Sequence, residues 1–246
     1  MKYFLLLISL LFFALPARAT WALVQHPSTT GCNGTTCAVT VTSTGAGHLL
    51  VFAALIGNTT STLSSVSGDG TWTVCGASCR SVSSVTTTEM GYILSATGGA
   101  TTITGTLSAT SPWSAAVLEY SYTSGPISVD AQGHREQTTG TTSCAGVTLT
   151  LTGTNDVIVQ IANPSGSISA VTSPYTSPAD FPGGNGVAGS INTTSGTAPT
   201  WTQTSSTDAL SAIAFKETAS GAVPGVNKRQ KIESMDNGSM AQFDVM

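Results

Sequence analysis

The nine residues His48–Ile56 constrain the fold of this chain more than any other segment. They read HLLVFAALI, and from Leu49 onward both faces of an extended chain are apolar. Turn-forming residues flank the run, with GAG at 45–47 before it and GN at 57–58 after it. The run is too short to cross a bilayer as a helix, which needs about 20 residues. We therefore predict a β-strand that is covered on both sides of its sheet.

Shorter segments along the rest of the chain alternate apolar residues with Thr or Ser, which is typical of half-buried strands. Turn residues recur between them, no segment has a convincing helical period, and no internal repeat has a solenoid period. The pattern predicts an all-β protein, a jelly-roll-like antiparallel β-sandwich of about a dozen strands. Besides the central run, the predicted strands are 20–26, 37–42, 71–74, 88–95, 101–107, 113–122, 127–131, 147–151, 156–162, 200–202 and 209–216.

The two ends of the chain differ in composition from the part between them. Residues 1–19 have a positive Lys2, an apolar stretch and a final A-R-A, which together predict a secretory signal peptide. Residues 20–217 then form the β-sandwich domain, and residues 218–246 are expected to be a flexible tail. We expect a protein that is secreted or held at the cell surface, without a membrane span.

The chain carries little charge and many hydroxyl groups. Charged residues make up 8% of it, and the formal net charge is −4. Nucleic-acid binding requires basic side chains that contact the phosphates, and this mildly acidic chain has no basic cluster in its globular part. We therefore expect no nucleic-acid partner.

Five cysteines suit an oxidising compartment. We predict the local disulfides Cys32–Cys37 and Cys75–Cys79, each of which closes a small loop and contributes about 2 kcal/mol. The spacings C-x4-C and C-x3-C are poor for a zinc site. Cys144 is left over, either as a buried thiol or as a competitor for one of the other four.

The segment from Trp113 to Tyr122 offers the best candidate ligand face. Alternation places Trp113 and Glu119 on the same side, and an aromatic plane beside a carboxylate suits a sugar ring. The alternative is structural, with Trp113 capping the edge of the core and Glu119 paired or solvated. Catalysis at Glu119 would need a second carboxylate within about 10 Å, and its neighbours on that face are Val117 and Ser121. We therefore assign no catalytic residue.

No motif in the sequence specifies a cofactor or a metal. Asp69, in the turn GDG, and the acids Asp130, Asp156 and Asp180 could bind calcium in principle, but the chain has no D-x-D-x-D-G loop. Asp69 is better explained as a turn residue whose side chain bonds its own backbone. The nucleophile motif G-x-S-x-G and the phosphate-binding motif G-x-x-x-x-G-K are both absent.

Taken together, the segments GHLLVFAALIG, SSVSGDGTWTVC, GGATTITGTL, AAVLEYSYTSGPISVDAQG and GTNDVIVQIA resemble a group of secreted bacterial β-sandwich proteins. That group is similar to the concanavalin A-like lectin/glucanase jelly roll. The resemblance covers Ala22–Lys216 and rests on turns and core strands, so it implies a fold and carries no catalytic residue across.

These observations lead to one expected function and two alternatives. We expect a non-catalytic module that binds a polysaccharide or cell-surface glycan, or that serves in surface adhesion, an expectation that rests on fold-level analogy. The alternatives are a structural cell-surface or matrix protein without a small ligand, and a glycoside hydrolase or lyase.

Overall fold

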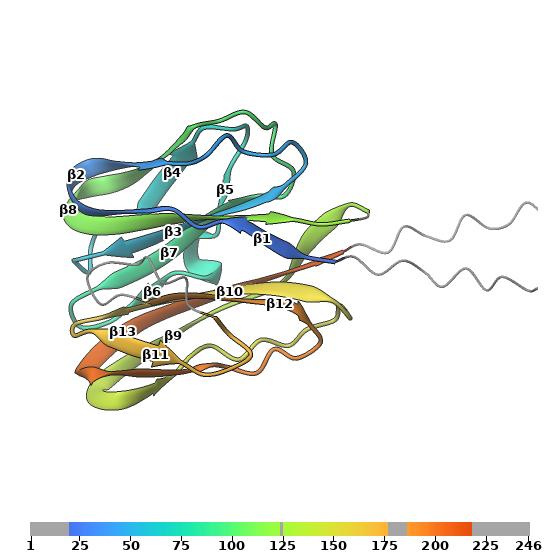
Figure 1. The fold of residues 1–246 in the computed structure, drawn as a ribbon. Coiled ribbons are helices and arrows are strands. Elements are labelled where there is room, and N and C mark those ends of the chain that lie inside the picture. The colour runs from blue at the N-terminus through green and yellow to red at the C-terminus, as the bar shows by residue number, and fades with distance from the viewer. Residues whose placement is uncertain (1–19, 124, 177–185, 218–246) are drawn as a thin grey trace, which may run out of the picture.

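The computed structural model describes residues 20–123, 125–176 and 186–217, which fold into two antiparallel β-sheets (Figure 1). Thirteen strands lie in this part of the chain, eight in one sheet and five in the other, so the predicted all-β sandwich is confirmed. The predicted signal peptide, the predicted tail and Asp180 lie outside the described residues. Over the described residues, no helix is long and apolar enough to span a membrane.

The first half of the chain, residues 20–123, forms the larger sheet. Its strands are β1 (Ala22–Gln25), β2 (Ser28–Thr40), β3 (Leu49–Ile56), β4 (Leu63–Ser67), β5 (Thr73–Val74), β6 (Ser81–Val82), β7 (Thr87–Ile93) and β8 (Thr102–Ser121), with the short 3-10 helix η1 (Gly76–Ser78) between β5 and β6. The second half, of which residues 125–176 and 186–217 are described, forms the smaller sheet. Its strands are β9 (Ile127–Ala145), β10 (Asp156–Pro164), β11 (Ile168–Val171), β12 (Gly186–Thr193) and β13 (Thr200–Glu217).

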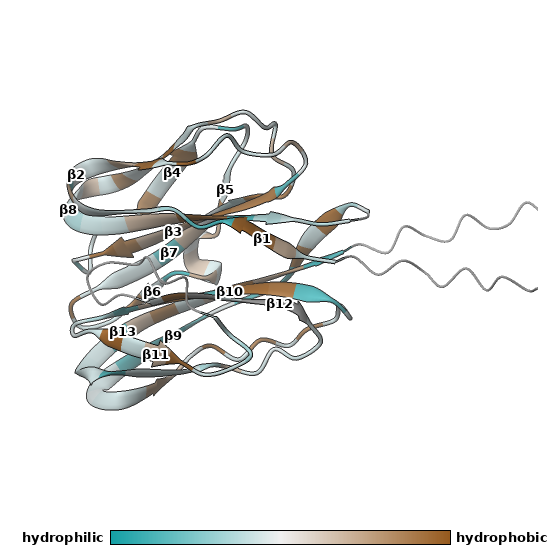
Figure 2. Cartoon of the chain, viewed as in Figure 1, coloured by the Kyte–Doolittle hydropathy of each residue, from teal (hydrophilic) through white to brown (hydrophobic). Residues whose placement is uncertain are grey.

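The central strand β3 is buried along its whole length, as predicted from its two apolar faces. Strand β10 is also buried at every residue. Figure 2 shows apolar segments along both strands, which face each other in the middle of the molecule. Each of these strands therefore packs against the opposite sheet on one side and against its own half on the other.

The same order of strand pairing occurs in both halves. In the first half the order is β2-β8-β3-β7, with β4 also paired to β8. In the second half it is β9-β13-β10-β12, with β11 also paired to β13. A faint sequence match accompanies the match in topology, since β4 reads LSSVS and β11 continues as ISAVT.

In each half, one long strand belongs both to the outer layer and to the sheet that contains the central strand, β3 or β10. The first part of β8 pairs with β2 and β4, and its last part pairs with β3. Strand β13 does the same with β9, β11 and β10. Figure 1 accordingly shows β2 and β4 at one end of the stack, β9 and β11 at the other, and β3 and β10 between them.

Three large apolar clusters fill the spaces between these layers, and a small fourth one is formed by Leu50, Ile93 and Ala96. The cluster between the sheets draws on both halves, with Trp21, Tyr120 and Phe215 as its largest fully buried side chains. A second cluster lies between β3 and the β2–β4 layer, around Phe52. The third lies between β10 and the β9–β11 layer, around Trp201. Because the first cluster is shared, the two halves have a common core.

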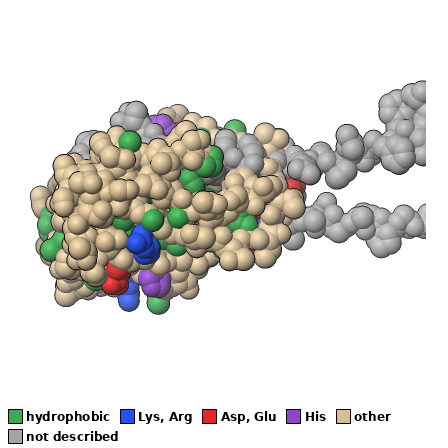
Figure 3. Space-filling view, turned by 90° about the horizontal axis from the view of Figure 1, so that it is seen from below, with side chains coloured by type: hydrophobic (Ala, Val, Ile, Leu, Met, Phe, Trp, Pro, Cys, Tyr) green, Lys and Arg blue, Asp and Glu red, His purple; other side chains and the backbone are tan. Residues whose placement is uncertain are grey.

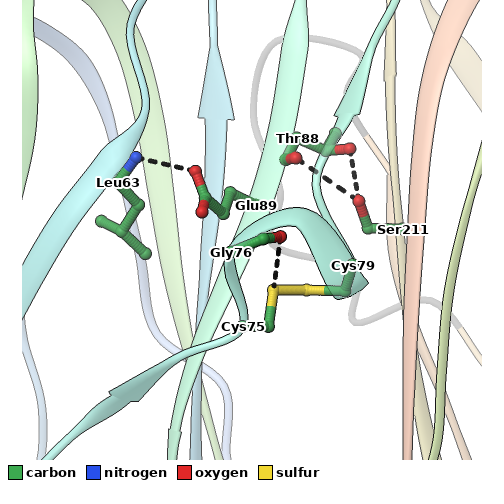
Figure 4. Close-up of a disulfide and its surroundings, with 7 residues drawn as sticks. All are labelled: Leu63, Cys75, Gly76, Cys79, Thr88, Glu89 and Ser211. Atoms are coloured by element: carbon green, nitrogen blue, oxygen red, sulfur yellow. Dashed lines mark hydrogen bonds between the residues drawn. A yellow bond between two sulfur atoms is a disulfide. The ribbon is translucent and has the colours of Figure 1, made fainter.

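Both predicted disulfides are present, and Cys144 is a buried free thiol. Figure 4 shows the Cys75–Cys79 bond across η1. Close by, Thr88 on β7 and Ser211 on β13 are joined by a buried 2.6 Å hydrogen bond between their hydroxyl oxygens. The two halves thus share polar contacts as well as apolar ones.

Several predicted boundaries are wrong. Residues 147–151 form no strand, because the side-chain amide of Gln160 takes the place of a neighbouring strand: its Oε1 accepts from Val147 N (2.9 Å) and its Nε2 donates to Val147 O (2.7 Å). The short segment predicted at 127–131 is instead the 19-residue strand β9. Residues 200–217 form one strand where two were predicted. Strands β4, β6, β11 and β12 lie in segments where no strand was predicted.

Candidate functional site

Trp113 and Glu119 lie on the same face of β8, as alternation predicts, but that face is not exposed. Trp113 is 3% exposed and Glu119 is 0% exposed. The Trp113 ring packs near Phe52, with 6.4 Å between ring centroids, in the cluster beneath β2 and β4. The expectation of an outward aromatic–carboxylate pair is therefore wrong, because the bend in β8 folds the outer layer over this face.

Glu119 is instead the centre of a buried hydrogen-bond cluster. Its Oε1 accepts from the backbone N of Gly45 at 2.7 Å and lies 2.5 Å from Nδ1 of His48. Its Oε2 accepts from the side-chain amide of Gln25. A carboxylate removed from water requires such partners, so Glu119 holds the turn before β3 against the end of β8.

The position of His48 depends on a glycine. A Cβ atom at Gly45 would lie 2.3 Å from the His48 ring, so any larger residue at 45 would displace the imidazole. The His48 side chain is 27% exposed, and Glu119 orients its ring. A histidine oriented by a carboxylate can act as a general base, but among the described residues His48 has no hydrogen bond to a serine, threonine or cysteine nucleophile.

Gln25 links this buried cluster to the surface. Its Nε2 donates to Thr42 O, and its Oε1 accepts from Thr42 N, both at 2.8 Å. The carboxamide therefore pairs with the backbone of residue 42 much as a neighbouring strand would. The same amide also donates to the buried carboxylate of Glu119, so the Gln25 side chain is held on two sides.

An open depression of about 450 Å³ lies directly over this arrangement. It is lined by Val24, Gln25, His26, Pro27, Thr40, Val41 and Thr42. The lining combines apolar surface with hydroxyl, amide and backbone groups, and it contains no Asp, Glu, Lys or Arg. Such a surface can hydrogen-bond the hydroxyl groups of an uncharged ligand while contacting its C–H groups.

The depression lies where the outer strand of the first half is interrupted. Strands β1 and β2 together pair with β8, much as the single strand β9 pairs with β13. His26 and Pro27 separate β1 from β2, since Pro27 has no N–H to donate, although its carbonyl still accepts from Val117 N at 2.9 Å. Sequence reasoning identified Glu119 but missed the lining residues. Pro27, after a strand pattern, was the signal that could have indicated them.

Half of the acids in the described residues are buried, which leaves few charges on the surface. Glu89, Glu119, Asp156 and Asp208 are each at most 1% exposed. Figure 3 shows a face on which charged side chains are few. Burial raises the pKa of Glu89, although the backbone N of Leu63 donates to its carboxylate at 2.8 Å (Figure 4).

Cys144 is not a reactive thiol. Burial first, and then the neighbouring Asp208, raise the pKa of Cys144 to about 12, so the sulfur stays protonated. Asp208 is itself buried, and this raises the pKa of its carboxyl group. Its Oδ2 accepts a hydrogen bond from the Gln203 amide at 2.6 Å. This pair belongs to the interior of the second half.

Of the described acids considered for calcium, Asp69 lies apart from the other two, Asp130 and Asp156. Asp69 has φ 62°, and its Oδ1 accepts from Gly98 N at 2.5 Å, so it is a turn residue. Asp130 and Asp156 meet in the second half, beside Lys216. Within the described ranges, no group of three or more His, Cys, Asp or Glu side chains could hold a metal ion. Glu119 is bonded to His48, Gln25 and Gly45, and none of these supplies a second carboxylate.

Comparison of the chain with protein-family models, with curated proteins and with solved structures finds no match.

Proposed function

We propose that the chain is a secreted, non-catalytic β-sandwich that binds an uncharged glycan, or adheres to a glycan-bearing surface, through the depression between β1 and β2. The observation that carries the proposal is the lining of this depression, which offers hydroxyl, amide and backbone groups beside apolar surface and contains no Asp, Glu, Lys or Arg. A neutral polysaccharide presents the complementary combination of hydroxyl and C–H groups.

In this proposal Glu119 is a positioning residue and does not touch the ligand. It fixes Gln25 through its Oε2, and Gln25 forms part of the lining. Trp113 is a core residue, so its truncation would weaken binding only through loss of the fold. The resemblance to the concanavalin A-like lectin/glucanase group agrees with this function but remains an expectation.

Binding of the full chain to a glycan array and to insoluble neutral polysaccharides tests the proposal, with Thr40→Arg as the blocking variant. Thr40 is exposed and lines the depression, so an arginine there should fill it and weaken binding about tenfold or more. Thr202→Arg is the matched control, because Thr202 is an exposed strand threonine on β13, in the other half. Added calcium or a chelator should change nothing, since the lining offers no carboxylate.

Saturable binding that Thr40→Arg weakens and Thr202→Arg does not would support the proposed site. An equal loss of binding in both variants would show that the ligand does not bind at the depression. Absence of binding to every neutral glycan would overturn the proposal.

A structural role at the cell surface is the second candidate, and the scarcity of surface charge favours it. Proteins with few surface charges associate more readily, because little electrostatic repulsion keeps their copies apart. Sedimentation of the purified full chain over a range of concentrations tests this role. Reversible assembly without glycan binding would favour it over the first proposal.

A further inference from the structure

Lys216 and Asp130 face each other across the first and last strands of the second half. Lys216 Nζ lies 2.7 Å from Oδ1 of Asp130, whose side chain is fully buried. Strand β9 carries Asp130 and strand β13 carries Lys216, and the pairing of the two strands shifts between Ala214 and Phe215. Asp130 occupies the extra position on β9 at this shift, which turns its carboxylate toward the lysine.

The second oxygen of Asp130 receives two consecutive backbone N–H groups. Thr152 N donates to Oδ2 at 2.6 Å and Gly153 N donates to it at 3.1 Å. Thr152 Oγ1 also donates to Oδ1 and accepts from Lys216 Nζ at 2.5 Å. Two backbone donors aimed at one carboxyl oxygen resemble the oxyanion holes that stabilise tetrahedral intermediates in acyl transfer.

A third group, Asp156, completes the cluster. It is 0% exposed, and neither of its carboxyl oxygens has a well-formed hydrogen bond from a donor in the structure. Burial first, and then the adjacent Asp130 carboxylate, raise the pKa of Asp156 to about 7. Asp156 therefore carries a proton over much of the ordinary pH range and holds it beside the carboxyl group of Asp130.

Gly153 makes room for the whole arrangement. A Cβ atom at this position would lie 1.9 Å from Oδ1 of Asp156 and 2.8 Å from the Cβ of Lys216. No side chain fits there without moving the carboxyl group or the lysine. The glycine thus brings an amine, a carboxyl group and a proton donor together with two N–H groups.

We propose that Lys216 and Asp130 condense to form an intramolecular amide bond, with Asp156 transferring the protons. The proposal does not depend on the glycan-binding function. It assigns a covalent modification to the chain, which would join the first strand of the second half to its last.

The reaction begins when a proton moves from the lysine ammonium to Oδ1, leaving a neutral amine and a neutral carboxylic acid. The amine lone pair attacks Cγ of Asp130, and the negative charge that develops on Oδ2 is held by the N–H groups of Thr152 and Gly153. Asp156 gives its proton to the departing Oδ1 hydroxyl and takes one from the nitrogen. One C–N bond forms, one C–O bond breaks, one water leaves, and Asp156 ends as it began, so no oxidant or cofactor is needed.

The corresponding place in the first half provides an internal comparison. There the buried carboxylate of Glu119 meets the imidazole of His48 and the amide of Gln25, neither of which supplies an alkyl amine. That half is closed by two disulfides, whereas Cys144 is the single cysteine of the second half. The amide bond would give the second half a covalent link of its own.

Peptide mass spectrometry of the reduced and alkylated full chain tests the proposal. Trypsin should not cleave after an acylated Lys216, so the peptide Ser81–Arg135 should appear joined to Glu136–Lys228. The joined species should weigh less than the sum of its parts by one water. Reduction removes the disulfides beforehand, so they cannot account for the link.

Three variants separate the amide from the ion pair. Lys216→Arg keeps the positive charge but cannot form this bond, so it should yield separate peptides. Asp130→Ala should do the same. Asp156→Asn retains both partners and should slow or abolish the link. Separate Ser81–Arg135 and cleavage after Lys216 in the wild-type chain would overturn the proposal, whatever the variants do. A link at full yield in Asp156→Asn would remove the role given to Asp156.

Discussion

In the first half of the molecule, buried Glu119 on the last strand binds the turn before β3, whereas in the second half, buried Asp130 on the first strand binds the turn before β10. Both carboxylates accept backbone N–H groups and face a basic side chain, His48 in one case and Lys216 in the other. In both halves, therefore, a buried carboxylate anchors the turn before the central strand, β3 or β10. The residues that do this differ between the halves.

The halves also differ in their outer strand. Strand β9 runs unbroken for 19 residues, while His26 and Pro27 divide its counterpart into β1 and β2. The interruption opens the depression and exposes Val24 to 50%. Under our two proposals, the first half contacts a ligand at this depression and the second half is closed by a covalent bond.

The largest effect is expected where the halves share their core. Phe215→Ala should destabilise the chain by about 4 kcal/mol, because the ring is fully buried between the sheets and packs edge-on against Tyr92 at 5.4 Å. Urea unfolding followed by tryptophan fluorescence and by circular dichroism measures this. Coincident single transitions are expected for wild type and variant, and two separate transitions would mean that the halves fold independently.

A smaller effect is expected from the anchoring carboxylate of the first half. Glu119→Ala should cost about 3 kcal/mol, because it leaves Gly45 N, the Gln25 amide and His48 without their acceptor. Glu119→Gln should cost less, since one carbonyl oxygen remains to accept. Equilibrium unfolding decides the order, and equal losses for the two variants would show that packing rather than hydrogen bonding matters at this site.

The raised pKa of Asp156 should make the stability of the folded chain depend on pH. Its folded pKa of about 7 lies above the unfolded value, so the folded state keeps a proton that the unfolded state loses, and the resulting stability falls as pH rises from about 4 to 7. In a Lys216→Arg chain, where no amide can form, adding Asp156→Asn should stabilise by about 2 kcal/mol at pH 8 and by little at pH 4.

Unfolding midpoints of the single and double variants across this pH range measure the difference. Glu89 and Asp208 also have raised pKa values, and they contribute equally to both chains. Parallel pH profiles for the two chains would contradict the assignment.

The smallest change in stability is expected at the strand break. Pro27→Val restores an N–H and a β-branched side chain, so it should make the first half more like β9 and change stability by less than about 1 kcal/mol. Glycan binding should nevertheless fall, because the depression depends on the interruption. The affinity for the polysaccharide used with Thr40→Arg measures this effect. An unchanged affinity would show that the ligand site does not depend on the interruption at Pro27.

The sequence allowed the parts of the fold that depend on local pattern to be predicted. Strand β3 could be predicted because both faces are apolar, and each disulfide because its cysteines are close in sequence. Strand β9 could not be, since AQGHREQTTGTTSCA has no clear alternation and is ordered by its pairing with β13. The face of Trp113 was predicted correctly, but its exposure was not, because β8 bends and residues far away in sequence cover it. Asp130, Asp156 and Lys216 meet only through the bulge on β9 and the turn before β10.

Hydrogen exchange of the full chain, with and without a neutral polysaccharide that it binds, tests the proposed difference between the halves most directly. Backbone amides in Val24–Gln25 and Thr40–Thr42 should become protected when the ligand is present, and the corresponding stretch of the second half, Ser128–Gln132, should not change. Protection at Ser128–Gln132, or equal protection in both places, would contradict the proposal that the interruption at Pro27 gives the first half its binding site.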